Sequence, residues 1–373
     1  GVAIVAERGE LPWAATDPEL RARRGQPPEA TPTGFRVDGS YKDPRLVEDL
    51  LRAYAGRFPE LASVRELGRS HGGRPILALK ISDGVTRDED EPAVFVNGAH
   101  HGSELMAVEY ALDVVQHLLE DYRADPAVRR RVDGLEIWCV PLVNPDGNHH
   151  YLYRSRAGGR KNGRDNDGDG ALMVWDGVDL NRNYPFLWGS LGEVGSRSLA
   201  SDGRYRGPRA ASEPEVQAIV ALARERRFAA AISFHTLATA VLSPYTIDGA
   251  QNPERDEAWA LAQRLVAAAP AQPNGRKYNV RRNLYPVDGT DQDWHRFAHG
   301  TLAYLVEGSH HNPRDPAVRA AAVRATRPVW TALLDALLDG PAISGHVRDS
   351  TGAPVEVEVV VEEVQPRQGE RWT

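Results

Sequence analysis

The stretch AHHGSELMAVEYAL, residues 99 to 112, joins an apolar, strand-like run to a segment with helical periodicity. The apolar run is AVFV, residues 93 to 96. Between the two lie His100, His101 and Glu104, three side chains able to bind a metal. A polar side chain at the end of a strand and one in the first turn of the next helix point toward one place above the sheet edge. The stretch therefore predicts a strand–helix unit with part of a metal site at its junction.

The same alternation of strand and helix patterns extends from about residue 41 to 339. We expect an α/β catalytic domain there, with a mixed, mostly parallel, twisted sheet and helices on both faces. The predicted strands are 75–81, 93–99, 135–143, 229–234 and 302–307. The predicted helices are 45–56, 104–119, 213–227, 254–269 and 315–338.

One predicted helix start has clear capping chemistry. In SEPE, residues 212 to 215, Ser212 is expected as the N-cap and Pro214 lies in the first turn. Glu215, three residues after the serine, is the expected capping-box partner.

The two ends of the chain differ from this pattern. Residues 1–40 are rich in proline, glycine and charge, which predicts an extended lead-in. Residues 340–373 contain AISGHVRDSTGAPVEVEVVVEEV, which alternates like a strand pair around a glycine-containing turn. So short a segment cannot bury a core of its own. We expect a short β appendage, either docked on the main domain or opening a further β-domain.

Composition narrows the function. The 373 residues are 41% hydrophobic, which suits a soluble globular protein, and no apolar run approaches the roughly 18 residues of a membrane span. The net charge of −7 argues against a nucleic-acid partner. The single cysteine, Cys139, lies in an apolar run and is expected to be buried. The start lacks both an initiator methionine and an export segment, which predicts a processed or trimmed product. An exported protein is compatible with this, and we expect a secreted or periplasmic location.

The metal site needs a third ligand from another strand end. His235 closes the apolar run AAAISFH, residues 229 to 235, and is the best candidate. Two histidines and one carboxylate leave zinc an open position for water, as catalysis requires. A His-x-x-Glu pair is weak by itself, because each histidine also fits an ordinary core or surface position. The neighbouring motifs decide between these interpretations.

Four further stretches accompany His101, Glu104 and His235. They are GRKN (159–162), DLNRNYP (179–185), LYPVDGTDQDW (284–294) and LAYLVEG (302–308). With these in order, residues 40 to 339 strongly resemble the zinc metallocarboxypeptidases, the family of carboxypeptidases A, B, T, D and E. The 134 positions between the two histidines suit that family. HGSE and YPVDGTDQDW are similar to the branch that includes carboxypeptidases D and E.

The C-terminal segment carries a second resemblance. ISGHVRDSTGAPVEVEV, residues 343 to 359, is similar to the first strands of the transthyretin-like domain that follows the catalytic domain in that branch. It implies that residues 340–373 are the start of such a domain.

The resemblance implies a zinc-dependent exopeptidase that removes the C-terminal residue from peptide or protein C-termini. Glu307 is the implied general base, and Arg160 the implied electrophile for the developing oxyanion. Asn181 and Arg182 are expected to receive the terminal carboxylate, and Tyr285 to close over it. A guanidinium fork matches a carboxylate with two hydrogen bonds. We expect the enzyme to act as a monomer.

Specificity depends on the pocket for the C-terminal side chain. Gln292 lies where the family has its pocket floor. The branch prefers basic residues through an acid that aligns near Thr246, which is uncharged here. Asp248 or Asp291 is the remaining source of negative charge. The resemblance still favours a basic C-terminal residue.

A second metal is expected in DNDGDGALMVWD, residues 165 to 176. Asp165, Asp167, Asp169 and Asp176 match an oxygen-ligand calcium loop. The alternative is a solvated acidic turn without metal.

Two other functions remain open from the residues. One is a cell-wall peptide amidase or carboxypeptidase of the same fold, which shares the zinc ligands. The other is a non-catalytic peptide-binding module. The presence of Glu307 favours an enzyme over the binding module, because a binding module has no need of a general base.

Overall fold

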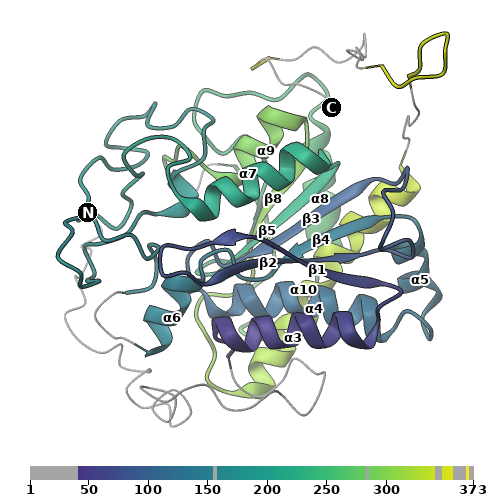
Figure 1. Cartoon of the computed structure of the whole chain (residues 1–373), viewed down its shortest axis with the longest axis horizontal. Coiled ribbons are helices and arrows are strands. Elements are labelled where there is room, and N and C mark those ends of the chain that lie inside the picture. Colours follow the sequence, from purple (N-terminus) through teal and green to yellow (C-terminus); the bar gives the residue numbers. More distant parts are fainter. Residues whose placement is uncertain (1–40, 154–157, 283–284, 341–346, 356–366, 369–373) are drawn as a thin grey trace.

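The structure, a computed structural model, describes residues 41–153, 158–282, 285–340, 347–355 and 367–368. A single twisted sheet crosses the molecule between two layers of helices (Figure 1). The strand order is β1-β2-β4-β3-β5-β8-β6-β7. The strands are β1 (Ala62–Arg69), β2 (Pro75–Ile81), β3 (Ala93–Gly98), β4 (Glu136–Val140), β5 (Ala230–His235), β6 (Ala240–Leu242), β7 (Val280–Arg281) and β8 (Leu302–Glu307).

The centre of the sheet is parallel. Strands β4, β3, β5 and β8 pair in parallel, whereas β1, β2 and β6 join the sheet by antiparallel pairing. The sheet is thus mixed, with a parallel centre, as the sequence predicts. The carboxyl ends of β3, β5 and β8 meet at one edge, which is where ligands bind in open α/β sheets.

Helices cover both faces, and Figure 1 shows α3, α4 and α10 on one side with α7 and α9 on the other. The helices are α3 (Pro44–Arg57), α4 (Leu105–Glu120), α5 (Pro126–Asp133), α6 (Pro145–Tyr153), α7 (Pro214–Arg226), α8 (Glu257–Ala268), α9 (Asp291–His299) and α10 (Pro316–Asp339). A short 3₁₀ turn, η1, spans Leu180–Arg182.

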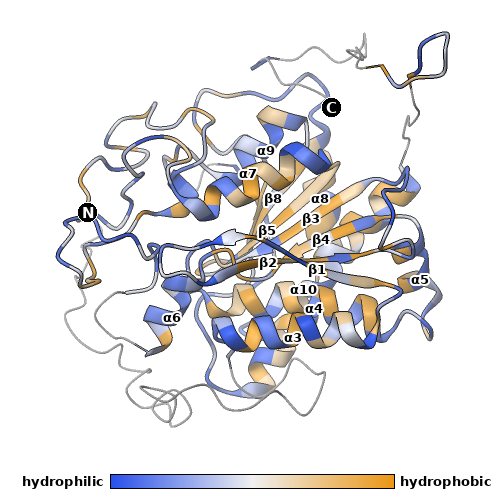
Figure 2. Cartoon of the chain, in the orientation of Figure 1, coloured by the Kyte–Doolittle hydropathy of each residue, from blue (hydrophilic) through white to orange (hydrophobic). Residues whose placement is uncertain are grey.

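Alternation along the central strands produces two cores. On β3, Val94 and Val96 join the core under α4, whereas Phe95 joins the core under α7 and α9. Because both faces of these strands are covered, they are mostly apolar, and the central strands are largely orange in Figure 2 while the helices mix blue and orange. Cys139 on β4 is buried, as expected.

All five predicted strands and all five predicted helices are present, with ends displaced by at most three residues. The missed elements are short or polar: β1 is a partly exposed edge strand, and β6 and β7 have only three and two residues. The predicted N-cap is wrong. The N-cap of α7 is Glu213, which makes no side-chain cap hydrogen bond, and the Ser212 hydroxyl donates to the Glu213 carboxylate.

The predicted lead-in, residues 1–40, lies outside the described residues, as does most of the C-terminal segment. Within 347–355 one antiparallel bridge joins Arg348 and Pro354 around a turn. The transthyretin-like start therefore stays a prediction. None of the helices in the described part of the chain has the length and apolar character needed to cross a membrane.

Candidate active site

A sharp turn after β3 presents the first two metal-capable residues. Ala99 has a φ of 58°, in the left-handed region that alanine rarely adopts. Gly102 follows where the chain passes against α6, and a Cβ there would overlap the backbone nitrogen of Asn148. His101 lies inside this turn and Glu104 immediately precedes α4. The turn thereby points both side chains over the carboxyl end of the sheet.

His235, the last residue of β5, completes the predicted ligand group. Glu104 lies between the two histidines: its Oε1 is 2.6 Å from Nδ1 of His101, and its Oε2 is 3.0 Å from Nδ1 of His235. One ligand atom from each residue lies within 4.8 Å of the others, and all three are buried. The predicted convergence of these distant residues is present in the structure.

The electrostatics of the group also suit a cation. Burial by itself raises the pKa of Glu104, but the two histidines more than offset it and lower that pKa below its usual range. Two imidazole nitrogens and a charged carboxylate are a donor set that zinc prefers, with a further position left for water or substrate. The residues present therefore fit zinc.

Asp179, which the sequence analysis missed, orients His101. Its Oδ1 is 3.1 Å from Nε2 of His101, on the ring edge opposite Glu104. The carboxylate is fully buried, and Arg160 and His101 hold its pKa well below the usual range although burial opposes them. A carboxylate behind a ligating histidine fixes the tautomer and the ring orientation. The sequence does contain a signal for Asp179, because this residue is the first one of the motif DLNRNYP.

Glu307 lies beside the metal group because of strand register. It is the last residue of β8 and pairs directly with His235 in the parallel β5–β8 ladder. Its Oε2 is buried without a hydrogen-bond partner. Burial, followed by the nearby Glu104 carboxylate, raises the pKa of Glu307 well above its usual value, and Arg160 opposes the shift. The expected partial desolvation is thus observed.

Arg160 lies at the rim of the metal group. Its Nε and Nη2 donate to Oδ2 of Asp179 at 3.1 and 2.6 Å. The remaining end, Nη1, is 3.4 Å from Nδ1 of His101. The Arg160 side chain as a whole is about one third exposed.

The residues predicted to bind a terminal carboxylate line the same pocket as the two histidines and Glu307. Arg182 is 2% exposed, and its Nε has no hydrogen-bond partner. Its Nη2 is 3.4 Å from the hydroxyl of Tyr285, a residue that is 50% exposed. Asn181 accepts a hydrogen bond from the backbone of Asp291 through Oδ1, which leaves its amide nitrogen for other partners.

One pocket connects these groups. Its lining residues are His101, Asn181, Arg182, His235, Leu242, Thr246, Arg282, Tyr285, Val287, Thr290, Gln292, Leu305 and Glu307. Among the described residues, Glu307 is the only carboxylate in that lining. Neither candidate acid contributes: Asp248 does not line the pocket, and Asp291 points to Asn97 and His295.

Gln292 is at the pocket, as predicted, and its amide is oriented by a buried relay. The hydroxyl of Thr246 donates to Asp293 at 2.8 Å, so its oxygen accepts from Nε2 of Gln292 at 2.9 Å. Oε1 of Gln292 is left buried and without a partner. Burial raises the pKa of Asp293 to about 6. The pocket therefore offers a neutral acceptor oxygen in place of an acid.

The acidic loop is only partly consistent with the calcium prediction. Asp165, Asp167 and Asp176 come together, whereas Asp169 stays outside the group. Both oxygens of Asp165 accept backbone amides, from Gly168 and Gly170. These carboxylates thus stabilise the loop through its own amides. Calcium here stays a sequence prediction.

Comparison with known proteins agrees with this geometry. The family model for zinc carboxypeptidases matches residues 47–315. A zinc carboxypeptidase of Saccharothrix mutabilis subsp. capreolus is 30% identical over 253 residues, covering 67% of this chain and 57% of that protein. A carboxypeptidase B of Helicoverpa zea is 27% identical over 276 residues, covering 72% and 62%. The chain spans about three fifths of the length of these two relatives.

The likeness extends to the fold. The crystal structure of carboxypeptidase A from Helicoverpa armigera superposes with a TM-score of 0.69 at 22% identity, covering 86% of this chain and 77% of that one. Bovine thrombin-activatable fibrinolysis inhibitor gives 0.66 at 21% identity, covering 80% and 98%. Because the family match includes the ligand group, Asp179, Arg182 and Glu307, the chain belongs to the zinc carboxypeptidase family.

Proposed function

We propose that the chain is a zinc-dependent exopeptidase that removes the C-terminal residue from peptides. One observation carries the proposal: a single pocket is lined by the two histidines of the metal group, by Glu307 and by the buried Arg182. A peptide carboxylate bound by Arg182 would bring its last peptide bond toward Glu307. The family match supports the zinc and the peptide substrate.

His101, Glu104 and His235 would hold the zinc, with Asp179 fixing the ring of His101. When bound, zinc supplies a Lewis acid that activates water and polarises the scissile carbonyl. Glu307 acts as the general base, taking a proton from the attacking water and passing it to the leaving amine. Its buried, unpaired Oε2 and raised pKa suit both halves of that task.

Arg160 would stabilise the oxyanion. Asp179 holds two of its donor nitrogens, which leaves Nη1 as the end directed toward the metal group. Donors placed in advance, where negative charge develops only in the transition state, lower the barrier without reorganising. Asp179 thus positions both His101 and Arg160 from one buried carboxylate.

Recognition of the terminal carboxylate restricts cleavage to the C-terminal residue of the substrate. Arg182 is buried with a free Nε, and the Tyr285 hydroxyl lies beside its guanidinium. A substrate without the free carboxylate would leave this buried charge unpaired, which is strongly unfavourable. This requirement separates a carboxypeptidase from an amidase that cleaves inside a cell-wall peptide. A cell-wall peptide with a free terminal carboxylate remains a candidate substrate.

The branch and specificity are finer parts of the proposal. HGSE and YPVDGTDQDW support the carboxypeptidase D and E branch. The unpaired Oε1 of Gln292 supports a C-terminal side chain that ends in an N–H donor, as lysine and arginine do. Arg282 in the lining acts against a full positive charge, and its pairing with Asp256 weakens that effect.

The first prediction concerns the metal. Asp179→Asn should lower zinc affinity about 10- to 100-fold, because His101 loses the carboxylate that orients it. Competition with a chelator measures the affinity. The control is Asp202→Asn, which removes an acid that forms an ion pair with Arg197 and not with a metal ligand. Unchanged zinc affinity in Asp179→Asn would refute the orienting role.

The second prediction concerns the base. Glu307→Gln should lower kcat by about 10²- to 10⁴-fold while zinc content stays at the wild-type level. Since the deprotonated carboxylate is the active form, wild-type kcat/KM should fall as pH drops through the pKa of Glu307, and this acid limb should disappear from the residual activity of the variant. Exposed Glu254→Gln is the matched control. Wild-type turnover by Glu307→Gln would refute the role of Glu307 as the base, whereas a wild-type protein that binds peptides without cleaving them would favour a binding module.

The third prediction separates an exopeptidase from an amidase. Blocked dipeptides should be cleaved much faster as free acids than as C-terminal amides. In Arg182→Lys the acid-to-amide ratio of kcat/KM should drop about ten- to hundredfold, because the bidentate, charged hydrogen bond is worth about 1.5–3 kcal/mol. Arg130→Lys, on the surface beside Asp339, is the control. Equal cleavage of acid and amide by the wild type would contradict the proposal.

The fourth prediction concerns specificity. Wild-type kcat/KM should favour C-terminal lysine or arginine over leucine, and Gln292→Leu should reverse that order by removing the acceptor. Gln251→Leu, which replaces an exposed glutamine outside the pocket, should behave like the wild type. A wild-type preference for leucine would disprove the basic preference, and a preference for glutamine would show that Arg282 dominates.

A further inference from the structure

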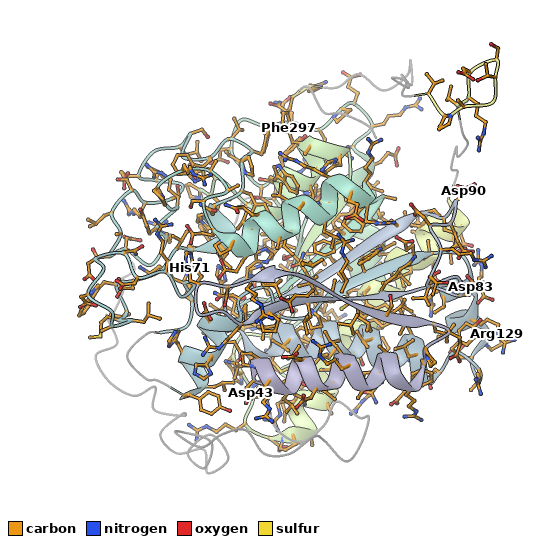
Figure 3. All side chains as sticks on the ribbon, in the orientation of Figure 1. Asp43, His71, Asp83, Asp90, Arg129 and Phe297 are labelled. Atoms are coloured by element: carbon orange, nitrogen blue, oxygen red, sulfur yellow. The ribbon has the colours of Figure 1, made fainter. Side chains whose placement is uncertain are left out.

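A second group of metal-capable side chains lies outside the active-site pocket. His71 comes from the turn between β1 and β2, and Glu213 and Glu215 come from the start of α7. One ligand atom from each lies within 4.8 Å of the others. Both glutamates are fully buried, whereas the His71 side chain is 31% exposed and opens the group to solvent. Figure 3 labels His71 at the end of the β1–β2 pair remote from Asp83.

Glu213 is fully paired in this group. Its Oε1 accepts from the Ser212 hydroxyl at 2.6 Å and from Arg164 at 3.1 Å. Its Oε2 is 2.9 Å from Nε2 of His71 and 2.8 Å from the amide nitrogen of Asn162. Burial opposes the charge, but these donors lower the pKa of Glu213 below its usual value. Glu213 is therefore an ionised carboxylate inside the protein.

Glu215 differs from Glu213, because one of its two carboxylate oxygens has no hydrogen-bond partner. Its Oε2 accepts one hydrogen bond, 3.0 Å from the same Asn162 amide. Its Oε1 is buried and has no partner. Burial raises the pKa of Glu215 to about 7. An unpaired, buried carboxylate oxygen is unfavourable, and a cation beside it would remove the penalty.

We propose that His71, Glu213 and Glu215 bind a second divalent ion, of the zinc type, separate from the active site. One imidazole nitrogen with two carboxylate oxygens is a donor set for zinc and similar transition ions. Calcium prefers oxygen ligands alone and is disfavoured by the histidine. Asn162 already donates to both carboxylates, so it would fix their orientation from behind the ion.

Binding at this site requires His71 to be neutral. Its Nε2 now faces Glu213, whose hydrogen bond is the main cause that raises the pKa of His71. The other charged groups around it are Glu215 of α7, Arg164, and Asp146 of α6, which is paired with Arg74. Zinc must displace the proton of a charged His71, so binding is best measured near neutral pH.

The site would also stabilise the part of the chain that carries Arg160. Asn162 exchanges two hydrogen bonds with Val178, through its backbone nitrogen at 3.0 Å and its side-chain oxygen at 2.8 Å. An ion at His71, Glu213 and Glu215 would connect the β1–β2 turn and α7 to this segment. Zinc binding should therefore raise the melting temperature.

The test measures zinc binding to the holoenzyme that already holds its catalytic ion. The wild type should take up a second equivalent near neutral pH, with an anomalous scattering peak between His71 and Glu215. Glu215→Gln and His71→Gln should each weaken that second equivalent at least tenfold and keep the first. Circular dichroism confirms that each variant is folded. Glu215→Gln preserves side-chain shape, so it serves if His71→Gln does not fold.

Two control variants locate the second ion. His117→Gln removes a histidine that is paired with Asp121 on α4, and Asp165→Asn alters the exposed acidic loop. Both should bind zinc like the wild type. The proposal is wrong if the wild type binds only one equivalent, if either cluster variant keeps the second, or if Asp165→Asn removes it. Calcium binding equal to zinc at the second site would also overturn it.

Discussion

The active site depends on one buried carboxylate held between two imidazoles. Glu104 is 4% exposed, and an isolated charge at that depth would be strongly unfavourable. His101 and His235 compensate for it by approaching from two different strand ends, to 2.6 and 3.0 Å. The buried charge of Glu104 therefore depends on both histidines. A divalent ion held by these three residues would supply positive charge where their lone-pair donors converge.

Strand register places the general base, Glu307, beside the metal ligands. Since β5 and β8 are parallel and aligned residue for residue, His235 and Glu307 leave the sheet side by side. The metal ligand and the base are thus positioned by backbone hydrogen bonds and not by flexible loops. A one-residue slip of β8 would point Glu307 to the other face of the sheet.

The substrate side of the pocket is joined to the metal side through a chain of buried polar contacts. Asp179 contacts both His101 and Arg160, and its Oδ1 also accepts the backbone amide of Asn181. Asn181 in turn accepts the backbone amide of Asp291 at the start of α9, next to Gln292. The residues expected to bind the carboxylate and the C-terminal side chain are therefore placed relative to the metal group by buried hydrogen bonds, which hold more firmly than exposed ones.

The sequence by itself determined the α/β class, the main strands and helices, and His101, Glu104, His235 and Glu307 as one set. Periodicity reports burial, and motifs report residue types at strand ends, so both are readable along the chain. Tertiary structure alone decided that Asp179 orients His101, that Asp293 orients Gln292 through Thr246, and that Glu215 is left with an unpaired oxygen. The physical reason is that pairing and burial of a polar group depend on what other segments bring against it, and those segments are remote in sequence.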